Sequence, residues 1–475
     1  MSTAESARPG LVRGLGVTAA ASITVCNIIG QGIFLKTRAM TCNVGAPTLV
    51  IAAWIAAGCL ATCAALTFAE LGALMPESGG PYKYLRAAYG QLSSFCYGWM
   101  ILFVAGPATI AALGAGAAIF FNALSGGALD QIHLVLPIPG FHFALSGSQL
   151  FSAFVIIAIA VVNCLPVNVN GWVATILTTA KILLVAGLTI AAFVLGHGTW
   201  AHFSANGLSG TCAGVDAATR GGASGFGAAM ISALYAYNGW YALTYIAGEV
   251  KNPGRTIPTA IAWSMAIVVT LYAIVNVAYF FVLSPQAIAS IAPTSSVGVE
   301  VVRSIFGATS GGVAAGIVLI SVIATLHVVM LSYARVTFAF AGDGLGLKWL
   351  ARASRWSHVP ISAVITTAFL GVLVAFSGTF ETLSNYLIFN EWVFFALTGT
   401  TIFLFRRRIP SEQRPYEVWG YPIVPMVFVG VAVWLLIQTA FTSPVQAFIG
   451  IAIVATGLPV YWLRSRNPAA RARLL

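Results

Sequence analysis

Apolar runs separated by short polar segments form the main pattern along this chain. Twelve of the runs hold roughly 20 residues or more, enough for a helix to cross a bilayer. Only two connecting segments are long, 124–146 and 196–223, and none resembles a soluble domain. The predicted spans are 15–38, 46–72, 92–123, 147–165, 171–195, 224–250, 258–283, 311–341, 360–377, 382–405, 421–440 and 445–464. The pattern therefore predicts an all-α polytopic membrane protein.

Two of these spans contain a break where a spanning helix should be most regular. Residues 30–32 (Gly-Gln-Gly) interrupt the span 15–38, and residues 237–240 (Tyr-Asn-Gly-Trp) interrupt the span 224–250. Glycine weakens a helix, and irregular backbone survives in hydrocarbon only where it lines a protein cavity or binds a ligand. Matching breaks in the two halves of a membrane protein predict a substrate site near the middle of the bilayer.

Composition agrees with a membrane location. Hydrophobic residues make up 59% of the chain and charged residues only 7%, whereas a soluble chain carries about 25% charge. The mean hydropathy is +0.91. The first 14 residues are polar and no signal-peptide cleavage pattern follows them, so we expect the first helix to direct insertion. The net charge of +11 comes from basic residues that punctuate apolar runs, which argues against a nucleic-acid partner.

Lysine and arginine predict the orientation. With the N-terminus inside the cell, 17 of the 23 basic residues fall in cytoplasmic segments and four in external ones. Lys181 and Arg335 lie within spans. Because basic residues concentrate on the cytoplasmic side, we expect both termini to be cytoplasmic. The expected location is the plasma membrane, or the inner membrane if the source is bacterial.

The seven cysteines show no metal-binding spacing, and no cofactor or metal is expected. Most of them lie in apolar helices, where a small buried thiol is the favoured interpretation. Cys42 and Cys212 are both predicted to face outward, so a disulfide between them is possible. We treat that disulfide as the less favoured alternative to two free thiols. His327 is interpreted as an interior histidine, since no second ligand stands three or four residues away.

Several motifs carry a resemblance to a known family. The resembling segments, which fall in the family's order over nearly the whole chain, are 27–34 (NIIGQGIF), 69–90, 234–261, 333–345 and 405–425. Together they resemble the amino acid–polyamine–organocation (APC) superfamily, and within it the L-type amino-acid transporters (the LAT group) and their bacterial relatives. Gln31 departs from the serine that the family often has there.

The resemblance implies a LeuT-like core of five plus five helices related by inversion, with discontinuous helices one and six, followed by helices eleven and twelve. The spacing agrees, since each broken helix leads a block of five. The implied divisions are a cytoplasmic tail 1–14, a first inverted repeat 15–195, an external loop 196–223, a second inverted repeat 224–405, a cytoplasmic loop 406–420, helices eleven and twelve over 421–464, and a cytoplasmic tail 465–475.

The first break is the predicted carboxylate site. The backbone amides of Gly30, Gln31 and Gly32 are expected to bind the substrate carboxylate, helped by the positive end of the half-helix that follows. Close packing of helices through small residues is the competing interpretation. By the resemblance, the carbonyl groups of Ile28, Tyr235 and Ala236 should accept hydrogen bonds from the substrate ammonium.

The far end of the substrate is expected to meet a second group of residues. Tyr235, one turn before the second break, is a predicted gate, and Asn238 and Gly239 are predicted to line the side-chain pocket. Glu391 falls where L-type relatives contact the substrate side chain, so it is a candidate for selecting a cationic substrate or relaying protons. A hydrogen bond to water or within its own helix is the alternative for Glu391.

Lys181 lies near the middle of a predicted span, where a lysine is costly. A lysine at this place in related transporters resembles a replacement for a bound sodium ion, so Lys181 is expected to bridge carbonyls near Gly30 and a hydroxyl such as that of Ser332. Whether Lys181 carries a coupling proton or remains a fixed ammonium stays open. Six other charged residues are expected to form ion pairs that close the inner gate: Glu70, Glu249, Lys251, Arg255, Arg335 and Asp343.

We therefore expect a secondary active transporter of L-amino acids, with neutral substrates favoured over cationic amino acids or polyamines. Exchange (antiport), proton symport and uniport are all compatible with the scaffold. A membrane-embedded enzyme is disfavoured because catalytic motifs are absent, and a channel because the halves are inverted within one chain. The lipid bilayer and an amino acid are the expected partners. Since residues 124–146 contain no cysteine, we expect no disulfide-linked heavy chain.

Overall fold

The computed structural model of the chain is almost entirely helical and describes residues 13–465 except 139–140, 208, 294, 378–379 and 443. Most of the two predicted tails, 1–14 and 465–475, lies outside the described residues. The helices are α1 (Val17–Ile28), α2 (Gly32–Val44), α3 (Pro47–Leu74), α4 (Pro81–Tyr89), α5 (Gln91–Met100), α6 (Gly106–Leu124), α7 (Gly147–Asn163), α8 (Val167–Val194), α9 (Gly222–Ala236), α10 (Ala242–Tyr245), α11 (Pro253–Val282), α12 (Pro285–Ala289), α13 (Val297–Phe306), α14 (Ser310–Gly342), α15 (Ile361–Ala375), α16 (Phe380–Arg408), α17 (Ile423–Thr442) and α18 (Pro444–Ser465).

Every predicted span coincides with at least one helix. Within the described residues, six helices are long and apolar enough to cross a membrane, and α1 with α2 makes a seventh if the bent pair is one span. Helices α7 and α15 and residues 448–463 of α18 are apolar but shorter. The structure therefore supports a mostly helical protein with six or seven spans, a coarser statement than the twelve predicted from the sequence.

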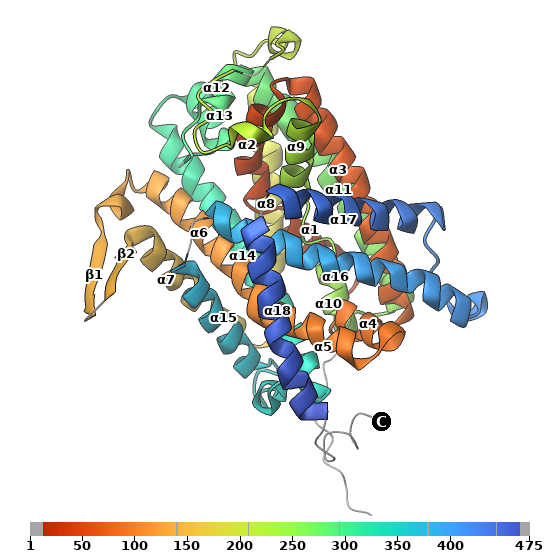
Figure 1. Cartoon of the computed structure of the whole chain (residues 1–475). Helices are drawn as coiled ribbons and strands as arrows, with labels where there is room; N and C mark the ends of the chain where they lie inside the picture. The colour runs from red at the N-terminus through yellow and green to blue at the C-terminus, as the bar shows by residue number, and fades with distance from the viewer. Residues whose placement is uncertain are drawn as a thin grey trace, which may run out of the picture.

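Helices from distant parts of the chain pack side by side. The closest pairs are α3 with α11, α6 with α14, and α2 with α9. In Figure 1, the red α2 and the yellow-green α9 lie together in the upper part of the molecule, with α1 and α10 below them. The two broken helices are therefore neighbours in space, although about 200 residues separate them in sequence.

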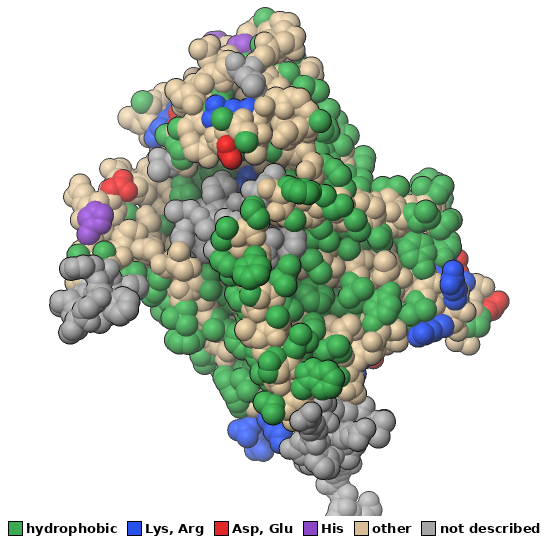
Figure 2. All heavy atoms as spheres, in the orientation of Figure 1, with side chains coloured by type: hydrophobic (Ala, Val, Ile, Leu, Met, Phe, Trp, Pro, Cys, Tyr) green, Lys and Arg blue, Asp and Glu red, His purple; other side chains and the backbone are tan. Residues whose placement is uncertain are grey.

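The surface follows the pattern expected of a membrane protein. Figure 2 shows apolar side chains over the middle of one face, whereas the lysine and arginine side chains on that face gather toward its edges. Large apolar side chains are exposed on several helices, among them Phe154, Trp172 and Trp263. Such exposure is costly in water and favourable in lipid, so the helix faces that carry these residues suit a bilayer.

The predicted breaks are confirmed, and two glycines explain how they meet. Helix α1 ends at Ile28 and α2 begins at Gly32, with a bend of 41° between them. A Cβ atom on Gly32 would lie 2.6 Å from that of Ala236 at the end of α9, so only glycine permits this approach. Gly239 has a φ of +118°, and a Cβ there would lie 2.9 Å from the backbone carbon of Asn27.

Three local features were not predicted. Strands β1 (His133–Ile138) and β2 (Phe141–Ser146) form an antiparallel hairpin within the connecting segment 124–146, and a Ser146–Gln149 capping box starts α7. Between α5 and α6, residues 101–105 form a π-helical turn. The following Pro107 lacks an amide hydrogen and cannot continue a regular ladder, which accounts for the irregular turn inside the predicted span 92–123.

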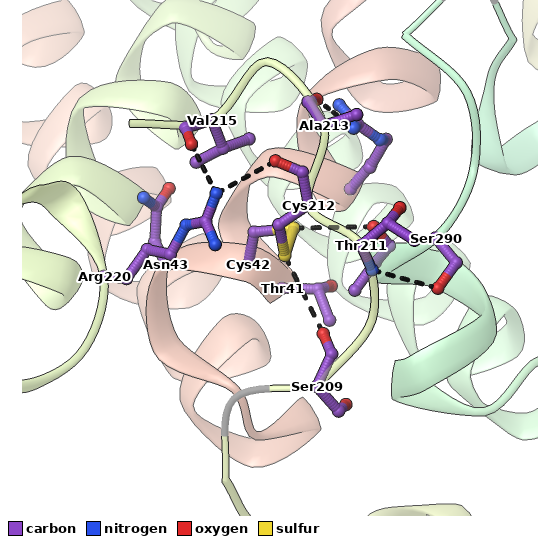
Figure 3. The surroundings of a disulfide bond; sticks show 12 residues. Thr41, Cys42, Asn43, Ser209, Thr211, Cys212, Ala213, Val215, Arg220 and Ser290 are labelled. Atoms are coloured by element: carbon purple, nitrogen blue, oxygen red, sulfur yellow. Dashed lines mark hydrogen bonds between the residues drawn. A yellow bond between two sulfur atoms is a disulfide. The ribbon is translucent and has the colours of Figure 1, made fainter. Parts of the chain in front are cut away.

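The structure corrects the interpretation of two cysteines, because Cys42 and Cys212 form a disulfide. The bond joins the C-terminal end of α2 to the segment between α8 and α9 (Figure 3). Arg220 reinforces this attachment by donating hydrogen bonds to the carbonyl oxygens of Cys212 at 3.0 Å and Val215 at 2.5 Å. Sequence spacing could not favour the bond, since 170 residues separate the two cysteines.

Candidate functional site

A small cavity lies where the two breaks meet. It has a volume of about 50 Å³, room for a few water molecules. Among the predicted site residues, nine line this cavity: Ile28, Gly30, Gln31, Gly32, Tyr235, Ala236, Asn238, Gly239 and Ser332. Lys181 and Glu391 do not line it and lie behind its walls. The structure thus brings together both predicted half-sites in one place.

The first break presents donors to the cavity. Within the described part of the chain, the amides of Gln31 and Gly32 meet no acceptor, as expected for the first turn of a helix such as α2. The amide of Gly30 is different, because it donates to the carbonyl oxygen of Ile28 at 2.8 Å. A carboxylate at this point would find two free amides and the positive end of α2.

The side chain of Gln31 crosses from the break to neighbouring helices. Its amide nitrogen lies 3.2 Å from the carbonyl oxygen of Ala112 and 3.4 Å from the hydroxyl of Tyr235. Its buried oxygen meets no donor among the described residues. The Lys36 ammonium makes a cation–π contact with Tyr235, 4.8 Å from the centre of the ring. This group of contacts positions Tyr235 at the cavity wall.

The predicted carbonyl acceptors are bridged by a residue that sequence reasoning missed. The hydroxyl of Tyr272 in α11 donates to the carbonyl oxygens of Ile28 at 3.0 Å and Ala236 at 3.3 Å. The carbonyl of Tyr235 accepts the amide of Asn238 at 3.1 Å. Tyr272 stands in the middle of the span 258–283, away from the membrane interfaces where tyrosine is usual. This unusual position is the sequence feature that could have indicated a functional role for Tyr272.

Lys181 binds the backbone of the first break without lining the cavity. Its ammonium donates to the carbonyl oxygens of Cys26 at 3.0 Å and Ile29 at 2.9 Å, and to the hydroxyl oxygen of Thr325 at 2.5 Å. The predicted hydroxyl partner was wrong: Ser332 donates instead to the carbonyl of Val328, one turn back in α14. Thr325 lies two turns earlier in the same helix and therefore faces the same side.

Glu391 is fully buried in α16 and binds residues of the second break. One carboxylate oxygen accepts the hydroxyls of Tyr241 at 2.9 Å and Tyr333 at 2.6 Å, and the other accepts the side-chain amide of Asn238 at 2.9 Å. These three donors line the cavity, whereas Glu391 does not. The carboxylate therefore acts on the cavity through its three partners.

Ion pairs link helices near the ends expected to be cytoplasmic. Glu249 and Arg335 form a buried pair at 3.0 Å, and Asp343 pairs with Lys83 and Arg86. Burial alone would lower the pKa of Arg86, but the charge and hydrogen bond of Asp343 raise it above its usual value.

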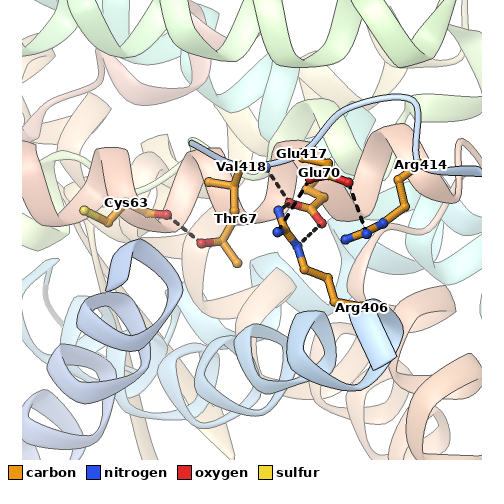
Figure 4. Close-up of polar contacts among 7 residues, drawn as sticks. All are labelled: Cys63, Thr67, Glu70, Arg406, Arg414, Glu417 and Val418. Carbon is orange, nitrogen blue, oxygen red and sulfur yellow. Dashed lines mark hydrogen bonds and ion pairs between the residues drawn. The ribbon is translucent and has the colours of Figure 1, made fainter. Parts of the chain in front are cut away.

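The third ion pair joins Glu70 to Arg406. Glu70 was among the six residues expected to form ion pairs near the inner gate, but Arg406 was not. The two side chains form a double hydrogen bond at 2.8 and 2.7 Å, and Glu70 also accepts the amide of Val418 (Figure 4). A double contact of this kind fixes geometry more firmly than a single ion pair. It joins α3 to α16 and to the segment before α17.

Comparison with known proteins shows which family the chain resembles. A family model described as amino acid permease matches residues 15–463. The serine/threonine exchanger SteT of Bacillus subtilis is 28% identical, over 97% of this chain and 99% of its own length. The b(0,+)-type amino acid transporter 1 of Homo sapiens is 29% identical, over 95% of this chain and 88% of its own.

A further relative, the large neutral amino acids transporter small subunit 2 of Oryctolagus cuniculus, is 30% identical over 95% of this chain and 80% of its own length. The family model covers nearly all the helices, including both broken ones. The expected resemblance is thereby confirmed, as is the expectation that the protein is a transporter and not an enzyme. The chain belongs to the amino acid permease family of membrane transporters.

Proposed function

We propose that this protein transports neutral L-amino acids by alternating access, binding each one as a zwitterion between the two broken helices. One observation carries the proposal: Gln31 and Gly32, whose amides meet no acceptor among the described residues, line the same cavity as Ile28 and Ala236, whose carbonyl groups end the two half-helices. An amino acid needs donors for its carboxylate and acceptors for its ammonium a few ångströms apart. The cavity offers both from main-chain groups, whatever the side chain of the substrate.

The neutral class is favoured by the surroundings of Glu391. Both of its oxygens already accept hydrogen bonds, so a cationic side chain would have to displace Asn238, Tyr241 or Tyr333 to reach them. Relatives named for serine and threonine, and for large neutral amino acids, support the same class. Cationic amino acids and polyamines remain the second candidate because Glu391 is the one acidic residue beside the cavity among the residues described.

We propose exchange as the mode of coupling, on the model of the exchanger from Bacillus subtilis. In this proposal Lys181 is a fixed tether and not a proton carrier. Its three oxygen partners are all well placed for an ammonium, and loss of its proton would weaken three short contacts at once. The site residues proposed for the carboxylate are Gly30, Gln31 and Gly32, and Ser332 remains a cavity-wall residue.

The membrane arrangement belongs to the same proposal. We place twelve spans in a five-plus-five inverted core followed by α17 and α18, with both termini in the cytoplasm of a cell whose plasma membrane, or bacterial inner membrane, holds the protein. The paired breaks in α1–α2 and α9–α10 support this arrangement. The excess of basic residues in the segments assigned to the cytoplasm supports the orientation.

Uptake of labelled serine into proteoliposomes tests the proposal. Vesicles preloaded with unlabelled serine should take up the label, and empty vesicles should not. Uptake into empty vesicles that follows an imposed pH gradient would replace exchange by proton symport. Strong uptake of labelled lysine or putrescine, with none of serine, would overturn the neutral assignment.

A further inference from the structure

We infer that Glu391 provides a fixed negative charge behind the cavity that makes the protein reject amino acids with acidic side chains. This inference rests on the proposed binding of amino acids between the two breaks and names a specificity determinant for that site. It concerns a residue that does not touch the cavity itself. Its effect comes from charge and from the three side chains that it holds in place.

The hydrogen bonds around Glu391 match an ionised carboxylate. Two phenol hydroxyls and one side-chain amide donate to its two oxygens, at distances from 2.6 to 2.9 Å. A protonated carboxyl group would itself have to donate one of these hydrogen bonds, and the hydroxyl of Tyr241 or Tyr333 would then have to accept it. None of its described hydrogen-bond or ion-pair partners is lysine or arginine, so no neighbouring cation cancels the charge.

The position of the carboxylate gives that charge a direction. Asn238 comes from the second break, Tyr241 precedes α10 and Tyr333 lies on α14, and all three line the cavity. A ligand atom that contacts one of them is one further hydrogen bond away from Glu391, roughly 6 Å in all. Lys181 binds the first break, where the substrate carboxylate is proposed to lie. The cavity therefore has a positive end at the first break and a negative end at the second.

This polarity suits a zwitterion and opposes a second carboxylate. Two unit negative charges about 6 Å apart, at an effective dielectric constant of about 20, repel each other enough to reduce binding on the order of 100-fold. An amide in place of the acidic side chain has nearly the same shape and no net charge. Aspartate compared with asparagine, and glutamate compared with glutamine, therefore isolate the contribution of Glu391 from that of size.

The experiment measures inhibition of labelled serine uptake by these four amino acids in wild type, Glu391→Gln and Glu300→Gln. Glu300→Gln is the matched control, because it removes the same charge from a partly exposed residue that pairs with Arg303. We expect wild type and control to bind asparagine at least tenfold more tightly than aspartate. In Glu391→Gln this preference should fall by at least tenfold. Should that variant not fold, Glu391→Met is a second neutral replacement.

Two results would overturn the inference: equal inhibition by aspartate and asparagine in the wild type, or the same preference in Glu391→Gln as in the control. Tyr333→Phe separates charge from positioning, because it removes a hydroxyl and keeps the carboxylate, so it should retain the preference for asparagine. Failure of the wild type to bind any amino acid, measured by thermal stabilisation, would instead sink the proposed function. Binding of serine by the wild type, together with the same aspartate–asparagine preference in Glu391→Gln and in the control, sinks only the inference.

Discussion

The hydroxyl of Tyr272 lies 3.0 Å from the carbonyl oxygen of Ile28, the last residue of α1. The same hydroxyl reaches Ala236, the last residue of α9, at 3.3 Å. One side chain on α11 thus contacts both helices at the point where each one breaks. Because these two carbonyls are the proposed acceptors for the substrate ammonium, Tyr272 is positioned to hold them at a fixed separation.

Replacing Tyr272 by phenylalanine should therefore weaken transport more than it weakens folding. Loss of one buried hydrogen bond costs about 1 kcal/mol, which corresponds to roughly a fivefold decrease in kcat/KM if the bond is retained in the transport cycle. Tyr279→Phe is the matched control: Tyr279 is buried two turns later in α11, and its hydroxyl meets no partner among the described residues. The test is to measure kcat/KM for serine uptake in both variants. An equal kcat/KM for Tyr272→Phe and Tyr279→Phe would contradict the role given to Tyr272.

The two glycines of the first break should respond differently to alanine. At Gly32 the added Cβ would lie 2.7 Å from the backbone of Ala236, so the breaks would have to separate, at a cost of about 1–3 kcal/mol. At Gly30 the nearest atoms belong to the Thr325 side chain at 3.5 Å, an ordinary contact. Gly32→Ala should lose most serine uptake, and Gly30→Ala should keep a larger share. Lower uptake by Gly30→Ala than by Gly32→Ala would contradict the conclusion that the close approach of Gly32 to Ala236 is needed for transport.

Removal of the Lys181 ammonium should disable the first break. Lys181→Met removes the ammonium donor from the carbonyls of Cys26 and Ile29, which keep only the longer contacts of the Thr325 hydroxyl at 3.4 and 3.2 Å, and each buried group left poorly satisfied costs about 1–3 kcal/mol. Thr325→Val removes a single partner and should be milder, while Thr325→Ser, which keeps the hydroxyl, should lie nearer to wild type. Thermal unfolding and serine uptake would be measured together. A fully active Lys181→Met variant would refute the tether.

Reduction of the disulfide should destabilise the attachment of α2 to the segment between α8 and α9. The bond closes a loop of 170 residues, and such bonds contribute about 2–5 kcal/mol. We expect a reductant to lower the melting temperature of the wild type and to leave that of a Cys42→Ser, Cys212→Ser double variant unchanged. Cys59 and Cys63, which are free in the structure, allow a Cys63→Ser control that keeps the sensitivity to reductant. Insensitivity of the wild type would argue against the bond.

The helices and their breaks could be predicted because each depends on residues close together in the sequence. A run of apolar residues sets where a helix can lie in a membrane, and glycines at 30, 32 and 239 set where it must stop. The hairpin after α6 was missed because its alternation is weak and its strands are only six residues long. The wrong interpretation of Cys42 has a different origin, since its partner is far away in the chain.

The sequence by itself determined a helical membrane protein with two broken helices, a buried lysine and a buried glutamate, because length, apolarity and glycine act locally. Tertiary structure decided what these groups touch. It selected Thr325 over Ser332 for Lys181, placed Tyr272 between two carbonyls, and surrounded Glu391 with three donors. Successive side chains of an α-helix point in directions about 100° apart around its axis. Which side chains meet therefore depends on how distant helices pack and rotate against one another, and no local sequence pattern records that.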